Sequence, residues 1–303
     1  SHKKPRLSEK RRTHLIELRR NEPHKERRFL PCTNAEVCAP KLSMKLAHLS
    51  WHKAEPILKN PDTLVVIPVG STEQHGPVGP LGTDWLIPEW IADEMEKRCD
   101  ILVTPVVPFG VATHHTSFPG TIDMGLDTMT GIFRGIFESL TRHGARRFLV
   151  VNGHGGNDPA IERAGLETAR RTGALISLLN WWSIAPQLNP EWTTGHGDAQ
   201  EVSAISFIHP ELVDLENCPE TRANNLSDDL VFTHLSSLKF RGANVKLVRD
   251  IRLGIPEGGY GGIPSEKATA EWGRAMMPAI VDYFCEFAEA FRKIPLDRPV
   301  EKI

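Results

Sequence analysis

From about residue 44 onward, short apolar runs rich in β-branched residues alternate with longer segments whose apolar positions recur at helical spacing. Residues 63–69 read TLVVIPV, which is typical of a strand buried on both faces. Residues 128–141 instead place Met129, Ile132 and Ile136 at helical spacing, which predicts an amphipathic helix. The two patterns predict strands at 63–69, 101–107, 147–151 and 174–179, and helices at 85–97, 128–141, 159–171, 201–208 and from 266 to about 292.

This alternation of strands and helices predicts an α/β fold, in which a mostly parallel sheet has helices on both faces. We expect a single domain, because no internal repeat and no low-complexity segment interrupts the pattern. The helix at 159–171 is expected to begin at Asn157 or Asp158, since both residue types are favoured N-caps.

The composition is that of an ordinary globular protein and excludes several other classes. Of the 303 residues, 40% are hydrophobic and 24% are charged, and the formal net charge is -2. A near-neutral chain argues against nucleic acid as a partner, because phosphate binding relies on an excess of Lys and Arg. The five cysteines are irregularly spaced without a C-x-x-C pair, which favours a cytoplasmic protein with reduced thiols. No run of about 18 apolar residues occurs, so a membrane is not an expected partner either.

The charge is unevenly distributed, and this sets the N-terminal segment apart. Residues 1–30 contain eleven Lys or Arg and four Glu, a net charge of +7, whereas the other residues sum to -9. We interpret residues 1–43 as a basic, solvated arm with a short helix at about 8–20, and residues 44–303 as the globular domain. A targeting or nucleic-acid-binding arm and an arm packed on a neighbouring subunit are the alternatives.

Polar side chains gather directly after the predicted strands, where ligands bind in open α/β sheets. Glu73, His75 and Asp84 follow the first strand within twelve residues, a set that suits a divalent cation. His154 follows the third strand among Gly and Asn residues, and Glu201 stands at the start of a predicted helix. The structural alternatives are loop polars at 73, 75 and 154, a helix N-cap at Asp84 and a favourable helix-dipole position at Glu201.

Two His and three carboxylates together allow two divalent ions that share one bridging carboxylate. Imidazole and carboxylate ligands suit zinc, manganese or iron. Two-metal sites supply a nucleophilic water or hydroxide at neutral pH, so the expected reaction is attack on a polarised carbonyl. Other chemistries lack support, because the chain has no G-x-S-x-G motif, no G-x-G-x-x-G after the first strand and no G-x-x-x-x-G-K-[ST].

Three motifs resemble the creatininase, or creatinine amidohydrolase, family. They are PVGSTEQHGPVGPLGTD at 68–84, FPGT at 118–121 and VNGHGGN at 151–157, in the family's order. The resemblance spans roughly residues 44–290 and leaves out the basic arm. It implies a metal-dependent hydrolase on one α/β domain, with a small-molecule substrate and a homo-oligomeric assembly, commonly a hexamer.

Carried over position by position, the resemblance also implies roles for individual residues. The implied metal ligands are Glu73, His75, Asp84 and His154. Asp84 would bridge the two ions. His196 stands five residues before Glu201, which implies an acid/base or substrate-orienting role for His196 and a metal-facing role for Glu201.

Two positions depart from the family pattern. Creatininase has Glu two residues beyond the His that matches His154, whereas this chain has Gly156, and we assign the missing ligand to Glu201. Val78 and Gly79 stand where many members have His-Leu, which removes a polar group near the site. Both departures argue against creatinine itself as the substrate.

These assignments define the expected centre and its reaction. One ion would bind Glu73, Asp84 and His154, and the other would bind His75, Asp84 and Glu201. His196 would protonate the leaving atom, and Glu201 is also predicted to be a catalytic residue. The expected substrate is a small cyclic amide or formamide cleaved at its C–N bond. Hydrolytic C–C cleavage of a cyclic polyol ketone, a non-catalytic metal or ligand binder and a nucleic-acid-associated protein are the alternatives.

Further residues near the motifs are secondary candidates. His115 precedes the FPGT motif and Trp182 ends the fourth predicted strand, so both are predicted to contact substrate. The alternatives are a loop histidine without a role at 115 and core packing for Trp181 and Trp182. The glycine-rich segment 258–262 is expected to cover the site or a subunit boundary. No partner is predicted for His114, His209 or His234.

Overall fold

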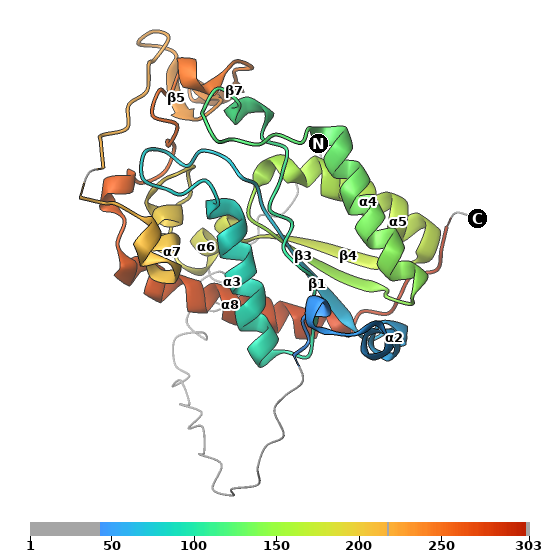
Figure 1. The fold of residues 1–303 in the computed structure, drawn as a ribbon. Coiled ribbons are helices and arrows are strands. Elements are labelled where there is room, and N and C mark those ends of the chain that lie inside the picture. Colours follow the sequence, from blue (N-terminus) through green and yellow to red (C-terminus); the bar gives the residue numbers. More distant parts are fainter. Residues whose placement is uncertain (1–42, 217, 301–303) are drawn as a thin grey trace, which may run out of the picture. The chain divides into compact units, whose positions relative to one another are not determined.

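The computed structural model describes residues 43–216 and 218–300 (Figure 1). The arm helix predicted at about 8–20 lies outside these residues, and the division of the chain near residue 43 stays a prediction. Within the described part of the chain, no helix is long and apolar enough to cross a membrane.

A four-stranded parallel sheet in the order β2-β1-β3-β4 forms the centre of the fold. Val69 pairs with Asn152, which pairs with Asn180, so the carboxyl ends of three strands meet at one edge of the sheet. The predicted parallel α/β fold is therefore confirmed. The strands are β1 (Leu64–Val69), β2 (Leu102–Val103), β3 (Arg147–Asn152) and β4 (Leu175–Asn180).

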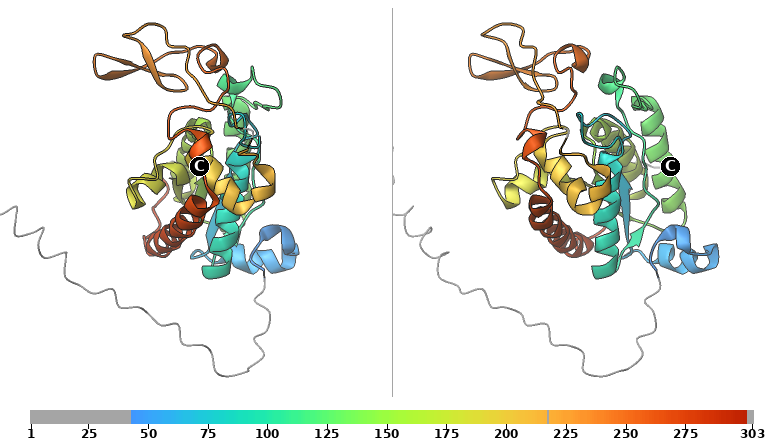
Figure 2. Two further views of the ribbon diagram at one scale, coloured as in Figure 1. Left: turned by 90° about the vertical axis from the view of Figure 1, so that its left-hand side faces the viewer. Right: turned by 60° about the vertical axis from the view of Figure 1, so that its left-hand side comes forward.

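Alternate residues of the strands enter two separate apolar cores, because successive side chains of a strand point to opposite faces. Leu64 and Val66 belong to one core, and Val65 and Ile67 to the other. The turned views in Figure 2 show the sheet between the two helical layers. The first core is covered by α3 (Thr83–Arg98), α6 (Trp181–Leu188), α7 (Ala199–Ile208) and α8 (Ala270–Arg292), and the second by α2 (Trp51–Lys59), α4 (Leu126–Arg142) and α5 (Asp158–Thr172).

Two predicted boundaries differ by several residues from the structure for local reasons. The second strand, predicted at 101–107, has only two residues, since Pro105 interrupts its hydrogen-bonding ladder and the chain rejoins the sheet only where Val107 bridges Val69. The last helix begins at Ala270 rather than at 266, because Thr269 caps it by accepting from the backbone N–H of Trp272.

Helix α5 begins at Asp158 with Asn157 as its N-cap residue, as predicted, but the Asn157 side chain makes no capping hydrogen bond. Asn157 instead accepts from the backbone N–H of Val111 at 3.0 Å and donates to the carbonyl of Gly70 at 2.9 Å. Its amide therefore ties together the loops that follow β1, β2 and β3.

The sequence pattern did not predict helix α2, helix α6 or a second, antiparallel sheet. Trp181 and Trp182 begin α6 rather than ending a strand. The second sheet lies at the top of Figure 1 and has the order β5-β6-β7. Its last hairpin turns at Arg241 and Gly242, whose φ angles of 47° and 87° suit a tight two-residue turn. Its strands are β5 (Val231–His234), β6 (Ser237–Phe240) and β7 (Ala243–Lys246).

Short 3₁₀ turns complete the described elements. Several of them lie in the loops at the carboxyl edge of the parallel sheet. They are η2 (Leu46–His48), η3 (Thr113–His115), η4 (Gly155–Asn157), η5 (Pro210–Leu212), η6 (Ile251–Leu253) and η7 (Ser265–Lys267).

Candidate metal centre

The five predicted metal ligands lie together in the structure, and all five are buried. Two come from the loop after β1, one from the loop after β3, and two from the first turns of α3 and α7. The residues are Glu73, His75, Asp84, His154 and Glu201. Because three of the side chains are acidic, their burial demands compensating positive charge.

Glycines at the ends of β1 and β3 bring the first turn of α3 into the centre. A Cβ atom on Gly70 would lie 2.2 Å from the carbonyl oxygen of Asp84, and one on Gly153 only 1.8 Å from it. Any other residue type would push the helix away. The close approach places the Asp84 carboxylate between the ligands from the two loops.

His154 directs a lone pair at two carboxylates. Its Nε2 lies 2.8 Å from the carbonyl oxygen of Val111, which can only accept, so Nε2 carries the proton. In the neutral ring, Nδ1 is therefore unprotonated, yet it lies 3.1 Å from Oδ2 of Asp84 and 3.2 Å from Oε1 of Glu73. A cation at this point would convert three mutually repelling atoms into ligands.

His75 repeats this arrangement on the other side of Asp84. Its Nδ1 donates to the carbonyl of Glu73 at 3.0 Å, which leaves Nε2 unprotonated in the neutral ring. Nε2 lies 2.8 Å from Oδ1 of Asp84 and 3.8 Å from Oε2 of Glu201. Metal-binding histidines commonly donate their second ring N–H to a carbonyl in this way.

The carboxylates of the centre are short of hydrogen-bond donors. Both carboxylate oxygens of Glu73 and Oδ2 of Asp84 are buried without a donor among the described residues. Burial raises the pKa of Glu73 and raises that of Glu201 to about 8. Burial lowers the pKa of His75, but Asp84 and Glu201 outweigh it and raise that pKa to about 10. The residues present thus fit divalent cations. When no metal is bound, protons on the same side chains supply the positive charge.

His196 lies beside the centre, as predicted. Its ring centroid is 4.5 Å from that of His75, and its Nε2 donates to the carbonyl of Gln74 at 2.7 Å. Burial lowers the pKa of His196 well below its usual value. The imidazole is therefore neutral at physiological pH.

His115 faces the centre more directly than its position in the sequence suggested. Its Nε2 lies 3.2 Å from Oε1 of Glu73, and its Nδ1 lies 2.7 Å from Nε2 of Gln74. The Gln74 amide also lies 3.0 Å from Nε2 of His196. Gln74 was not predicted, because its only signal in the sequence is its place between two candidate ligands.

A cavity of about 360 Å³ opens onto the centre. Trp182 lines it and also packs on the core, whereas Trp181 is buried in the core, and the contact of Trp182 with substrate stays a prediction. No side chain fits at Gly156, where a Cβ would lie 2.3 Å from Nε2 of His154. A Glu at this position, as in creatininase, would therefore displace the His154 ring, and the assignment of the missing ligand to Glu201 stays a prediction. The cavity is also lined by three basic side chains, His114, His234 and Lys246. No role was predicted for any of them from the sequence.

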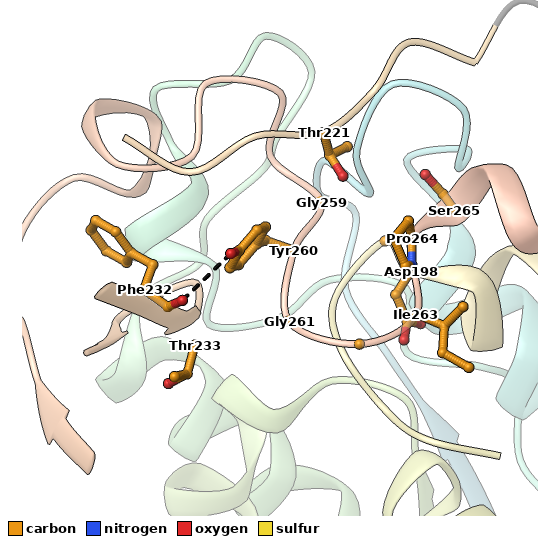
Figure 3. Close-up of a pocket in the computed structure, with 12 residues that line it drawn as sticks. Asp198, Thr221, Phe232, Thr233, Gly259, Tyr260, Gly261, Ile263, Pro264 and Ser265 are labelled. Atoms are coloured by element: carbon orange, nitrogen blue, oxygen red, sulfur yellow. Dashed lines mark hydrogen bonds between the residues drawn. The ribbon is translucent and has the colours of Figure 1, made fainter. Parts of the chain in front are cut away.

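The glycine-rich segment 258–262 packs directly on the centre. Tyr260 exchanges two backbone hydrogen bonds with His196, at 3.2 and 2.9 Å. A second cavity, of about 260 Å³, adjoins this segment and includes Asp198 and Tyr260 (Figure 3). The segment thus supports the loop that carries His196, while its predicted role at a subunit boundary stays a prediction.

A parallel α/β sheet with a buried carboxylate and imidazole centre at its carboxyl edge defines a metal-dependent hydrolase. The family model described as creatinine amidohydrolase matches residues 47–288. The chain therefore belongs to the creatininase family, and it is an enzyme of the metal-dependent amidohydrolase class.

Three curated relatives illustrate the range of this family. The chain is 31% identical over 195 residues to a creatinine amidohydrolase of Pseudomonas putida. This match covers 57% of the chain and 75% of the relative. It is 30% identical over 256 residues to a mycofactocin precursor peptide peptidase of Mycobacterium tuberculosis, and the match covers 77% of this chain and 92% of the relative. It is 25% identical over 240 residues to a 3-dehydro-scyllo-inosose hydrolase of Thermotoga maritima, and the match covers 73% of this chain and 75% of the relative.

Solved structures agree with the fold. A mutant creatininase of Zn-Zn type has a TM-score of 0.67 and 24% identity, covering 83% of this chain and 99% of that one. A creatinine amidohydrolase-like protein of Bacteroides fragilis has a TM-score of 0.62 and 25% identity, covering 84% and 99%. Another creatininase structure contains manganese. The ligand clusters in this chain support a divalent metal as cofactor.

Proposed function

We propose that this protein is a dinuclear metal-dependent hydrolase that cleaves the C–N bond of a small cyclic amide or formamide. The observation that carries the proposal is the orientation of His75 and His154. Each gives one ring N–H to a backbone carbonyl and turns its other ring nitrogen toward buried carboxylates. This arrangement is stable with cations between the side chains and costly without them.

The two oxygens of Asp84 support its role as the bridge between two ions. Oδ2 faces His154 and Oδ1 faces His75. One ion would be held by Glu73, Asp84 and His154, and the other by His75, Asp84 and Glu201. Zinc, manganese and iron suit this mixed set of ligands. Bound divalent ions polarise a carbonyl and lower the pKa of water.

The remaining residues of the cavity serve proton transfer and substrate placement. His196 is buried beside His75, and in this proposal it transfers a proton from the attacking water to the leaving nitrogen. Glu201 is held by the backbone N–H of Gly197 at 2.6 Å, which fixes its carboxylate toward the centre. Trp182 forms one wall of the cavity, and His115 contacts substrate or orients Glu73.

Hydrolytic C–C cleavage of a cyclic polyol ketone is the second candidate reaction, because it needs the same polarised carbonyl. The Thermotoga maritima relative is named an inosose hydrolase, which favours keeping this reaction in the test. A cavity of about 360 Å³ admits a small ring of either kind.

The test combines metal analysis with a substrate screen. Purified full-length protein should contain about two divalent ions per chain, and zinc- or manganese-loaded protein should hydrolyse formamides, cyclic amides or cyclic ketones. Removal of the metal by chelation should abolish turnover, and its return should restore it. Absence of stoichiometric metal after reconstitution would overturn the proposal. Two bound ions without turnover of any class would instead indicate a metal or ligand binder.

We also propose that the protein is a cytoplasmic homo-oligomer, with the hexamer of the family resemblance as the expected state. Mass measurement in solution tests the assembly, and fractionation of the native host tests the location. A monomeric mass at micromolar concentration would contradict the first proposal.

A further inference from the structure

The outer part of the active-site cavity carries a row of basic side chains that the proposed reaction does not use. His114 comes from the loop after β2, and His234 and Lys246 come from the small antiparallel sheet. The ring centroid of His114 lies 6.5 Å from that of His154. The basic row therefore begins beside His154, one of the predicted metal ligands.

The small sheet places two of these side chains on one face. His234 of β5 pairs with Ser237 of β6, which pairs with Lys246 of β7. Directly opposed residues of neighbouring strands share a face, so His234 and Lys246 stand on the same side, roughly 10 Å apart across two strand spacings. Both line the cavity.

An irregularity in β5 directs His234 to this face. Phe232 pairs with Leu238, but His234 pairs with the next residue, Ser237, because the register shifts between them. Without the shift, Phe232 and His234 would point the same way. The bulge at Thr233 instead leaves Phe232 in an apolar cluster with Leu238 and turns His234 toward the cavity.

Specific contacts hold the small sheet and its flanking loops against the loops of the site. Arg252 donates to the carbonyl of Ser117 at 2.9 Å, and the Ser117 hydroxyl donates to Asp250 at 2.8 Å. Tyr260, paired with His196 through its backbone, donates its hydroxyl to the carbonyl of Phe232 at 3.4 Å (Figure 3). The basic row is thus built into the wall of the cavity.

Two of the three members of the basic row are unpaired among the described residues. Among residues 43–216 and 218–300, no ion pair or side-chain hydrogen bond engages His234 or Lys246. Asp123, which lies near His114, already accepts from the backbone N–H groups of Ala112 and Gly125 and from the hydroxyl of Thr113. Burial lowers the pKa of His114 to about 4 and that of His234 as well, so Lys246 supplies the fixed positive charge beside two neutral imidazoles.

We propose that His114, His234 and Lys246 form a subsite for an anionic group of the substrate, a carboxylate or a phosphate ester. The ammonium group supplies the charge, and the imidazoles supply ring N–H donors. The inference rests on the proposed hydrolase and narrows its substrate to a small amide or ketone that carries an acidic group. The acidic group would lie at the cavity mouth while the carbonyl reaches the centre.

Matched pairs of compounds test the subsite separately from the reaction. The carboxylate arm compares N-formylalanine with N-formylalaninamide, and the phosphate arm compares N-formyl-O-phosphoethanolamine with N-formylethanolamine. Binding to zinc-loaded, full-length protein is measured by calorimetry, and hydrolysis by formate release. We expect the anionic member of at least one pair to bind about 10- to 100-fold more tightly.

Charge variants identify the residue responsible. Lys246→Met should reduce the preference for the anionic member to less than about threefold, and Lys246→Glu should reverse it. Lys239→Met, which removes an exposed lysine from the neighbouring strand, should keep the wild-type preference. Lys239 does not line the cavity, so it controls for the general electrostatic field.

The outcomes distinguish the two proposals. Equal binding within both pairs, or equal effects of the variants at 246 and 239, would overturn the subsite. A charge preference in binding without hydrolysis of any compound would support the subsite and count against the hydrolase. Hydrolysis without any charge preference would support the hydrolase and overturn the subsite.

Discussion

Nδ1 of His154 lies 3.1 Å from Oδ2 of Asp84, and neither atom carries a proton when the imidazole is neutral. The ring has already committed its N–H to the carbonyl of Val111. Oε1 of Glu73 approaches the same nitrogen at 3.2 Å. Three lone pairs therefore converge in a buried space, which is stable only when a cation, either a proton or a metal ion, lies among them.

Loss of Asp84 should have the largest effect on metal content, because its two oxygens face both ion sites. We expect Asp84→Asn to retain less than about one ion per chain and to lower kcat by at least about 100-fold, since a neutral amide is a poor bridge. Inductively coupled plasma analysis of the dialysed protein measures the ions. The matched control is Glu94→Gln, which removes a carboxylate from the outer part of the same helix. An unchanged metal content in Asp84→Asn would contradict the bridging assignment.

Metal binding should release protons. The pKa of His75 is raised to about 10 in the metal-free centre, so this ring is protonated at pH 7 and must lose its proton before Nε2 can bind a metal. Each proton released makes the metal affinity rise about tenfold per pH unit between pH 7 and 10. Calorimetric titration with zinc in two buffers of different ionisation enthalpy counts the protons. A binding heat that is independent of the buffer would contradict this prediction.

His115 offers a choice between two roles, and one variant decides between them. If His115 orients Glu73, His115→Ala should weaken metal binding by about 10- to 100-fold, as loss of such supporting hydrogen bonds does elsewhere. If it contacts only substrate, KM should rise while metal affinity stays unchanged. The 3.2 Å approach of its Nε2 to Glu73 favours the first outcome. His209→Ala, at a partly exposed site where the ring contacts Glu211, controls for the loss of an imidazole.

Local patterns predicted the parallel sheet and identified the candidate ligands, because both depend on short stretches of sequence. The residues 63–69 are apolar enough to identify a buried strand, and the glycines after the strands identify tight loops. The small antiparallel sheet was missed because its strands have only four residues and mixed polarity. Lys246 could not be assigned to the cavity, since its place depends on the bulge in β5 and on pairing across the whole sheet.

The same limit applies to Gln74 and Asn157, which connect loops far apart in the sequence. Gln74 reaches His115 and His196, and Asn157 reaches Gly70 and Val111. Their partners lie 41 to 122 residues away. A pattern of neighbours along the chain carries no information about such contacts, which only the folded loops create.

Gly156 should resist substitution even by alanine. A Cβ there would lie 2.3 Å from both Nε2 of His154 and the carbonyl of Val111, so Gly156→Ala must break the hydrogen bond that sets the His154 ring. We expect a loss of roughly 1–3 kcal/mol in the free energy of unfolding, together with weaker metal binding. Gly135→Ala, within helix α4 and with no atom within 4 Å of its Cβ position, should instead stabilise the protein by up to about 1 kcal/mol. Urea unfolding of both variants measures the difference, and equal midpoints would contradict it.

Asp198 should make the metal-free protein less stable as the pH rises. Its Oδ1 caps helix α7, while its Oδ2 is buried without a donor among the described residues, and burial raises its pKa from 3.8 to about 7. Between these values the unfolded chain loses the proton but the folded protein keeps it, so stability falls by up to about 1.4 kcal/mol per pH unit. Asp198→Asn keeps a good cap without the ionisation, so its stability relative to the wild type should increase from pH 4 to pH 7 and then level off. Urea unfolding at several pH values tests this, with the exposed Asp127→Asn as control; a difference that does not change with pH would show that Asp198 does not hold its proton.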